Sequence, residues 1–193
     1  MRDRSTDDTR TLHSRRALLA AGGAAGTALL GGCLGGGGDP GSESGSGGDT
    51  TTDAAGTDWQ SVELDEVRGG ETFTIAGLQS PTIVHSFAVW CPKCERLSNQ
   101  LTAIDGEYTI LGLNTDPNED AAKVREYAEE NDFGWRFAVA PTDLTDALVA
   151  EFGSTVVNAP STPVIVVCGD GSTTFLSGGD STRPTITNTA EGC

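Results

Sequence analysis

From Trp59 onward, the spacing of apolar residues predicts strands and helices in alternation. Residues 81–89 are almost continuously apolar over the length of one strand, which is typical of a central strand covered on both faces. Apolar positions then recur every three or four residues up to Asp105-Gly106, which predicts a helix ending at this pair. The apolar face of this helix consists of Cys94, Leu97, Leu101 and Ile104. The first cysteine of a closely spaced pair, Cys91, therefore falls at a strand-to-helix junction.

Downstream, the same two patterns repeat as far as a final hairpin. The predicted strands are residues 108–113, 136–140, 163–168 and 172–177, the last two forming the hairpin. Two helices are predicted between them, one after the turn residues 116–118 and one capped by Thr142 and stopped by Gly153. This order predicts an α/β fold with a central mixed sheet flanked by helices. Residues 180–188 contain a proline and β-branched residues, so we expect a C-terminal helix that is short or absent. One sheet face would then be thinly covered, or covered by another chain.

Residues 1–32 predict an export signal. Arg15 and Arg16 stand directly before the apolar run 17–30, which resembles a twin-arginine signal. The run is shorter than the about 20 apolar residues that span a bilayer. It ends in Leu-Gly-Gly-Cys33, which resembles a lipoprotein box. We expect cleavage before Cys33 and a lipid on this cysteine that anchors the protein at the outer face of the cell membrane; the alternative is an ordinary signal peptide with an incidental Cys33.

Composition divides the remainder into a tether and one domain. Residues 33–58 are mostly Gly, Ser, Thr and Asp, which predicts a disordered tether, and residues 59–193 have room for one globular domain. The formal net charge of -16 and the pI near 4.2 argue against nucleic acid as a partner. Acidity spread over the whole chain is typical of a surface suited to high salt, as in a halophile.

The cysteine pair has the spacing of a reactive dithiol. Cys91 and Cys94 would lie on one face of a helix about one turn apart, close enough to form a disulfide. The helix N-terminus favours the thiolate of Cys91, Lys93 adds a weaker exposed charge, and Pro92 suits the first helical turn. Cys94, on the apolar face, is placed to attack a mixed disulfide at Cys91 and release the reduced product.

Two other interpretations of this pair remain, a static structural disulfide and half of a zinc site. Neither Cys168 nor Cys193 has a second cysteine or a histidine beside it, so a second zinc-ligand pair is missing, and we expect no metal and no cofactor. We predict instead that Cys168 and Cys193 form a structural disulfide. The alternative is a buried thiol at Cys168 and a frayed terminal Cys193.

Two segments resemble the thioredoxin superfamily, in particular its extracytoplasmic TlpA/ResA-like branch. They are residues 87–94, Phe-Ala-Val-Trp-Cys-Pro-Lys-Cys, and residues 161–163, Ser-Thr-Pro. The resemblance implies a thioredoxin-like fold with an additional strand and helix around residues 114–140. It also implies a cis Pro163 facing the cysteines, a Thr162 backbone that pairs with substrate, and a Trp90 that shields the disulfide. The alternatives are a trans proline at a strand edge and a core tryptophan.

The resemblance implies an oxidoreductase that reduces disulfides in exported proteins and is supplied by a membrane electron donor, and the N-terminal sequence adds the expectation that it is membrane-anchored. A copper-binding module using Cys91, Cys94 and His85 is the main rival. Against it, the chain after the signal contains no methionine and no histidine except His85. A thiol peroxidase of the same superfamily is a third reading, disfavoured because Cys91 lacks the Pro and Thr that precede a peroxidatic cysteine there.

His85 stands six residues before Cys91 on the predicted central strand. An alternating side chain at this position can point beneath the Cys94 sulfur, where related proteins carry a polar group that handles the proton. We therefore predict that His85 tunes the redox pair. The alternative is a core histidine bonded to a backbone carbonyl.

Overall fold

The computed structural model describes residues 58–193, so the predictions for the export signal, Cys33 and most of the tether lie outside the described residues. A five-stranded sheet in the order β5-β4-β3-β6-β7 forms the centre of this part. The central strand β3 is parallel to β4, which is parallel to β5, whereas β6 is antiparallel to both β3 and β7. The strands are β3 (Thr82–Phe87), β4 (Thr109–Asn114), β5 (Arg136–Val139), β6 (Val164–Val167) and β7 (Thr173–Leu176). The predicted mixed sheet is confirmed.

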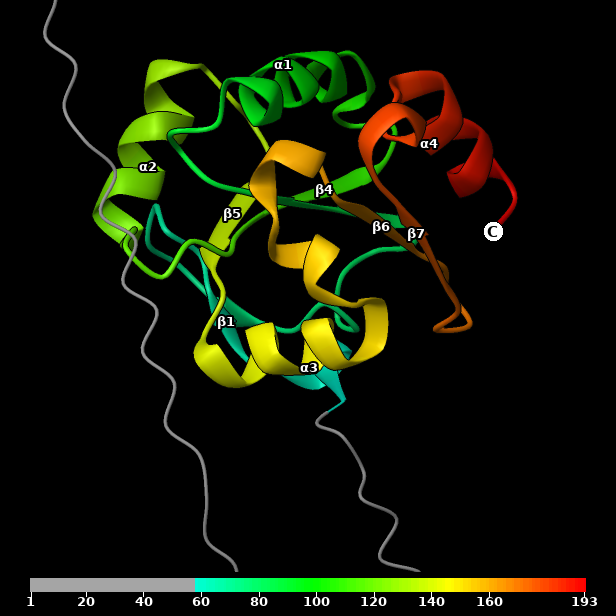
Figure 1. The fold of residues 1–193 in the computed structure, drawn as a ribbon, viewed down its shortest axis with the longest axis horizontal. Helices are drawn as coiled ribbons and strands as arrows, with labels where there is room; N and C mark the ends of the chain where they lie inside the picture. Colours follow the sequence, from blue (N-terminus) through cyan, green and yellow to red (C-terminus); the bar gives the residue numbers. More distant parts are fainter. Residues whose placement is uncertain (1–57) are drawn as a thin grey trace, which may run out of the picture. The chain divides into compact units, whose positions relative to one another are not determined.

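Helices cover both faces of the sheet, as Figure 1 shows, with α3 on one side and the other three on the opposite side. They are α1 (Pro92–Leu101), α2 (Ala121–Glu130), α3 (Thr142–Phe152) and α4 (Arg183–Glu191). All six residues of β3 are buried, as expected for a central strand covered on both faces. Ile83 and Phe87 pack in the layer of α1, α2 and α4, while Val84 packs in the layer of α3.

Smaller elements complete the described part. A short antiparallel pair, β1 (Leu64–Asp65) and β2 (Thr72–Phe73), stands apart from the main sheet. The backbone N–H of Val67, just after β1, donates to the carbonyl of Phe137 in β5 at 3.0 Å and so links the two. The 3-10 helices are Trp59–Ser61, Thr102–Ile104, Ser154–Val157, Ala159–Ser161 and Gly178–Asp180.

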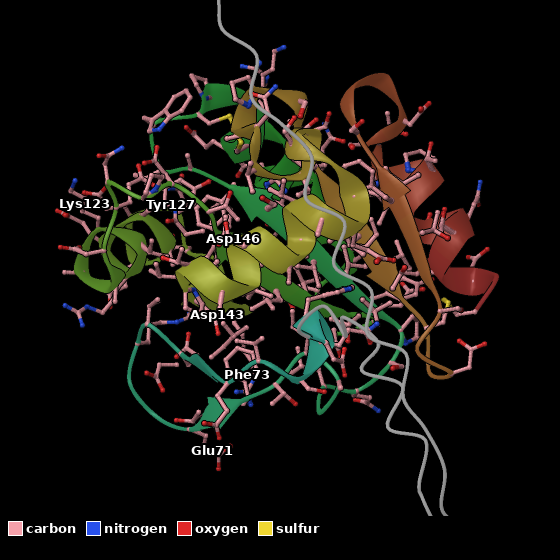
Figure 2. The ribbon with its side chains drawn as sticks, turned by 60° about the horizontal axis from the view of Figure 1, so that its bottom comes forward. Glu71, Phe73, Lys123, Tyr127, Asp143 and Asp146 are labelled. Atoms are coloured by element: carbon pink, nitrogen blue, oxygen red, sulfur yellow. A yellow bond between two sulfur atoms is a disulfide. The ribbon has the colours of Figure 1, made fainter. Side chains whose placement is uncertain are left out.

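The additional helix and strand, α2 and β5, are held by an aromatic cluster. The Phe137 ring of β5 meets Phe87 edge-on at 5.6 Å between centroids, and Phe87 stacks on Tyr127 of α2 at 5.3 Å. A Cβ at Gly112 would come within 2.4 Å of the Phe137 ring, so only glycine fits beneath it. Figure 2 shows Tyr127 together with Lys123 on this helix, and the exposed Asp143 and Asp146 on α3.

The start of α3 differs from the prediction by one residue. Thr142 is the first helical residue rather than the cap, and the cap position is held by Pro141, which has no side-chain acceptor. Gly153 ends the helix at a φ of 77°, as its type predicts.

The C-terminal helix is short, but it forms. Thr182 caps α4 by accepting a hydrogen bond from the Thr185 amide, and Pro184 lies in the first turn, where no amide donor is needed. Ile186 and Ala190 are buried in the same layer as α1. The low helix propensity of these residues is outweighed by burial of one apolar face, because packing supplies most of a helix's stability in proteins. The expectation of a thinly covered sheet face was therefore wrong.

A disulfide joins Cys168, just after β6, to Cys193, just after α4, with the two Cα atoms 5.1 Å apart. The bond closes the chain across the β6–β7 hairpin and α4. It therefore ties the end of α4 to the turn between β6 and β7.

Replacing both Cys168 and Cys193 with serine should lower the free energy of unfolding by about 3 kcal/mol, because the link restricts the unfolded chain. Chemical denaturation without reductant measures the difference. Repeating it with the thiols of both proteins reduced is the control, in which the two should agree. Equal stability of the two proteins without reductant would show that the link contributes nothing.

Candidate redox site

Cys91 is the residue that caps α1. Strand β3 ends at Phe87, four residues earlier, and Pro92 occupies the first helical position, where its missing donor costs nothing. The Cys91 sulfur accepts a hydrogen bond from the Cys94 amide at 3.2 Å, and the two cysteines form a disulfide with their Cα atoms 5.3 Å apart. The sulfur thus lies against the positive end of the helix, which favours a thiolate when the disulfide is reduced.

The two sulfurs differ in their surroundings. Cys91 is 2% exposed and Cys94 is fully buried, whereas Lys93 between them is exposed. The Cys94 sulfur lies 3.2 Å from the carbonyl oxygen of Ala159, which can accept the thiol proton in a hydrogen bond once the disulfide is reduced. Cys91 is therefore the sulfur that a large substrate can reach first. The role of Ala159 was not visible in the sequence, because its backbone carbonyl, not its side chain, makes the contact.

Trp90 lies on the surface rather than in the core. It is 59% exposed, and its indole Nε1 donates to Oδ2 of Asp116 at 2.5 Å. This hydrogen bond is the main cause that lowers the pKa of Asp116, together with donors from Asn118. The indole lines a small hollow of about 170 Å³ beside the disulfide, together with Ala159 and Pro160. The alternative of a core tryptophan was wrong.

The loop after β4 holds the chain that leads to the cysteines. Oε2 of Glu119 accepts hydrogen bonds from the amide of Val89 at 2.8 Å and from Nδ2 of Asn114 at 2.6 Å. The Thr115 amide donates to the carbonyl of Phe87 at 3.1 Å. The sequence pattern predicted only a turn at residues 116–118, and the role of Glu119 was not predicted. An acid in a loop that directly follows a neighbouring parallel strand was the available signal, since the carboxyl ends of such strands lie together.

His85 is buried in the same sheet layer as Cys94. Its Nδ1 lies 3.3 Å from the carbonyl oxygen of Pro163, and its Nε2 has no hydrogen-bond partner within the described residues. Burial lowers the pKa of His85 to about 4, an effect that the carbonyls of Pro163 and Cys94 only partly offset. The imidazole is therefore neutral at neutral pH and lies beside the Cys94 backbone.

The segment Thr162-Pro163 differs from what the resemblance implied. The Thr162–Pro163 peptide bond is trans, and Ser80–Pro81 is the cis bond among the described residues. Thr162 has a left-handed backbone with φ 48°, and its amide donates to the carbonyl of Ala159 at 2.8 Å, so this amide is not free for a substrate. The sequence could not reveal the isomer, because trans and cis forms at a proline differ by only about 1 kcal/mol.

Other features of the described residues bear on the alternatives. In residues 58–193 no three His, Cys, Asp or Glu side chains are grouped so that they could hold a metal ion. No helix of the same part is long and apolar enough to cross a membrane.

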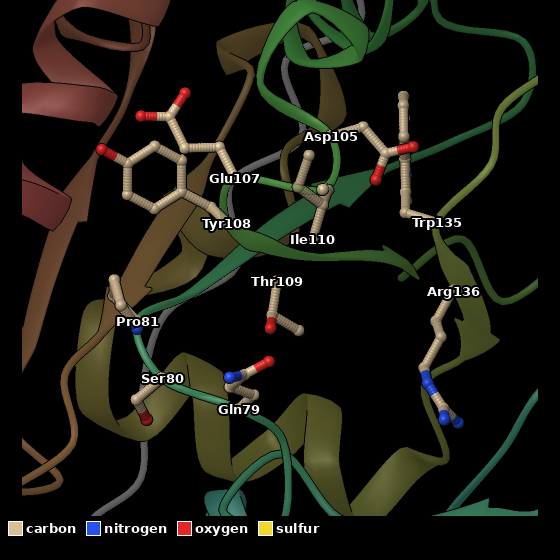
Figure 3. A pocket seen from close by; sticks show the side chains of 11 residues that line it. Gln79, Ser80, Pro81, Asp105, Glu107, Tyr108, Thr109, Ile110, Trp135 and Arg136 are labelled. Atoms are coloured by element: carbon tan, nitrogen blue, oxygen red, sulfur yellow. The ribbon is translucent and has the colours of Figure 1, made fainter.

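A hollow of about 370 Å³ lies away from the cysteines (Figure 3). Pro81 and Thr109 line it at the starts of β3 and β4, whereas the cysteines follow the end of β3. Tyr108, Asp105 and Arg136 also contribute to its walls. It therefore takes no part in the chemistry of the disulfide.

No family model and no curated protein sequence matches the chain. Several solved structures are similar to it in fold. A secreted disulfide oxidoreductase of Mycobacterium tuberculosis, homologous to E. coli DsbE, has a TM-score of 0.54 and 14% identity, covering 70% of this chain and 97% of its own. A thio-disulfide isomerase of Thermus thermophilus has a TM-score of 0.53 and 18% identity, with 66% and 88% covered. A thioredoxin-like protein of Aeropyrum pernix has a TM-score of 0.51 and 12% identity, with 68% and 89% covered. At these identities the likeness is one of fold: residues 58–193 adopt a thioredoxin-like fold.

Proposed function

We propose that the protein is a thiol–disulfide oxidoreductase that reduces disulfides in exported proteins through Cys91 and Cys94. The observation that carries the proposal is the asymmetry of the pair, with the Cys91 sulfur at the start of α1 and the Cys94 sulfur buried behind it. A structural disulfide does not need one sulfur to be held by amides that stabilise a thiolate. The similar structures named as a disulfide oxidoreductase and a thio-disulfide isomerase support the same activity.

The reaction takes place in two exchanges. The Cys91 thiolate attacks one sulfur of the substrate disulfide, which forms a mixed disulfide and expels the other substrate sulfur as a thiolate with its electron pair. Cys94 then loses its proton and attacks the Cys91 sulfur, which forms the Cys91–Cys94 disulfide and releases the second substrate thiolate. Two electrons have passed to the substrate, and a membrane donor returns two electrons, which with one proton restore the Cys91 thiolate and the Cys94 thiol.

His85 is the proposed acceptor of the Cys94 proton. A general base must be unprotonated before it acts, and burial, which lowers the pKa of His85 to about 4, keeps the imidazole neutral at neutral pH. An imidazole of such low pKa is a weak base, so it takes the proton only as negative charge develops on the Cys94 sulfur, which raises the pKa of His85 again. Its Nε2 is buried without a partner, whereas Nδ1 is occupied by the Pro163 carbonyl. The free nitrogen is therefore the one that receives the proton.

The N-terminal sequence supports a location for this activity. We propose that the twin-arginine-type signal exports the protein and that a lipid on Cys33 holds it at the outer face of the membrane. Residues 34–58 would then act as a flexible tether, and the acidic surface would suit a medium of high salt.

Replacing Cys91 with serine should abolish reduction of insulin, because a hydroxyl does not form the attacking anion at neutral pH. Replacing Cys94 with serine should instead trap mixed disulfides, visible as heavier bands on non-reducing gels. The variant with serine at both Cys168 and Cys193 is the control and should retain activity. Undiminished turnover by the Cys91→Ser protein would contradict the proposal.

Replacing His85 with asparagine should slow the second exchange by about 100-fold at pH 7, because the side chain no longer accepts the Cys94 proton. Quenched-flow analysis with a fluorescent peptide disulfide separates formation of the mixed disulfide from its resolution. Formation should change little.

Ser86→Ala is the matched control for this variant. Ser86 is the next residue on β3, is equally buried and donates to the Val156 carbonyl, away from the cysteines. If the His85→Asn and Ser86→Ala proteins resolve the mixed disulfide equally fast, His85 has only a structural role.

Replacing Cys33 with alanine should move most of the protein from the membrane fraction to the soluble fraction of cells that export it. Mass spectrometry of the wild-type N-terminus should find the lipid on Cys33. A Cys33→Ala protein that still sediments with membranes would reveal another anchor.

A further inference from the structure

A groove extends from the disulfide to the start of α3. It consists of two adjoining hollows, one of about 170 Å³ beside Trp90 and Ala159 and one of about 470 Å³ that reaches Thr142 and Thr145 of α3. Both are lined by Thr115, Asp116, Pro117 and Val157, so they form one continuous depression. This depression is called the α3 groove below.

The walls of the α3 groove are mostly apolar, and the charged residues among them are all acidic. Val139, Ala140 and Val157 supply apolar surface in the larger hollow. The two charged residues that line the groove, Asp116 and Glu119, are both acidic, and no described lysine or arginine lines it. This combination suits a side chain with an apolar stem and a cationic end.

Glu119 retains an unused acceptor. Its Oε2 accepts from Val89 and Asn114, whereas its Oε1 makes no hydrogen bond to any described residue. Asp116 differs, since Oδ2 accepts from Trp90 and Oδ1 from Asn118. A cation in the groove would therefore be held mainly by Oε1 of Glu119, with Asp116 adding a second negative charge nearby.

The start of α3 offers backbone donors to the same groove. The amide of Leu144 donates to Oδ1 of Asp143 at 3.0 Å, but Pro141, at the cap position, has no side-chain acceptor for the amides of Thr142 and Asp143. The carbonyl oxygens of an extended chain could take that place. The positive end of the helix, equivalent to about half a charge, reduces the attraction for a cation but does not cancel two carboxylates.

We propose that the α3 groove selects substrates with a lysine or arginine within a few residues of the reacting cysteine. The substrate segment lies extended in the groove, its basic side chain runs along Val139 and Ala140, and its charge pairs with Glu119. This inference rests on the proposed function, since the segment is placed by the bond from its cysteine to Cys91. Attack by the Cys91 thiolate forms that bond, breaks the substrate's own disulfide and expels its partner thiolate with the electron pair.

Synthetic peptides of ten residues test the selection. Each contains one cysteine in a mixed disulfide with 2-mercaptoethanol, and a lysine is placed at one of the positions flanking it; a matched set has norleucine instead. Stopped-flow measurement with the reduced protein in about 1 M KCl suppresses long-range steering, because the screening length is then about 3 Å. For at least one position the lysine peptide should react about threefold faster than its norleucine partner.

Two variants and a control locate the preference. Glu119→Gln, which keeps an oxygen for the Val89 amide, should lower the lysine-to-norleucine ratio to about one, and Thr142→Lys should lower it by placing a cation at the far end of the groove. Glu151→Gln removes the same charge from an exposed position at the other end of α3 and should leave the ratio unchanged.

The outcomes separate this inference from the proposed function. Equal rates for all lysine and norleucine pairs, or a preference that persists in both groove variants, would overturn the selection while leaving the oxidoreductase intact. A reduced wild-type protein that reacts with none of the peptides, nor with bis(2-hydroxyethyl) disulfide, would instead overturn the proposed function.

Discussion

The hydrogen bond from the Cys94 amide to the Cys91 sulfur is the interaction on which the arrangement of the site depends. It makes a cysteine the cap of α1, so the reactive sulfur and the positive end of the helix are brought together by the same residue. The cap in turn needs a fixed approach from β3. Glu119 provides it by holding the Val89 amide, two residues before the cap. The acidic loop after β4 is therefore a part of the redox site, even though none of its side chains touches a sulfur.

Cys94 and His85 share a buried layer of the protein, and this burial determines how a proton can leave Cys94. Cys94 and His85 lie in the layer that α1, α2 and α4 close over the sheet, where water cannot exchange protons freely. In the proposed reaction a buried thiol needs a protein group to take its proton, and burial, which lowers the pKa of His85, keeps that residue neutral until the thiol gives up its proton. The helix α4 contributes Ile186 to this layer, so the short C-terminal helix helps to close the core that contains Cys94.

Contacts set by local pattern could be predicted, and contacts set by packing could not. The apolar run of β3 and the three-and-four spacing after it placed Cys91 correctly at the helix start, because both signals come from neighbouring residues. The helix α4 was underestimated, since its stability comes from burying Ile186 against distant elements. Three further features depend on segments that meet only in the folded chain. They are the isomer of Pro163, the Ala159 carbonyl beside Cys94 and the hydrogen bond from the Val89 amide to Glu119.

The acids near the disulfide and the start of α1 have opposite effects on the Cys91 thiolate. Negative charge beside Cys91 disfavours its thiolate, whereas the start of α1 favours it, and the helix acts at closer range because its amide bonds directly to the sulfur. Asp116 accepts a hydrogen bond from Trp90, and Glu119 accepts hydrogen bonds from Val89 and Asn114. These donors offset part of the negative charge of the two carboxylates. A cationic substrate residue beside Glu119 would offset the remaining negative charge of the carboxylates while Cys91 must be an anion. Substrate charge would then affect reactivity as well as binding, which connects the selectivity of the groove to the chemistry of the cap.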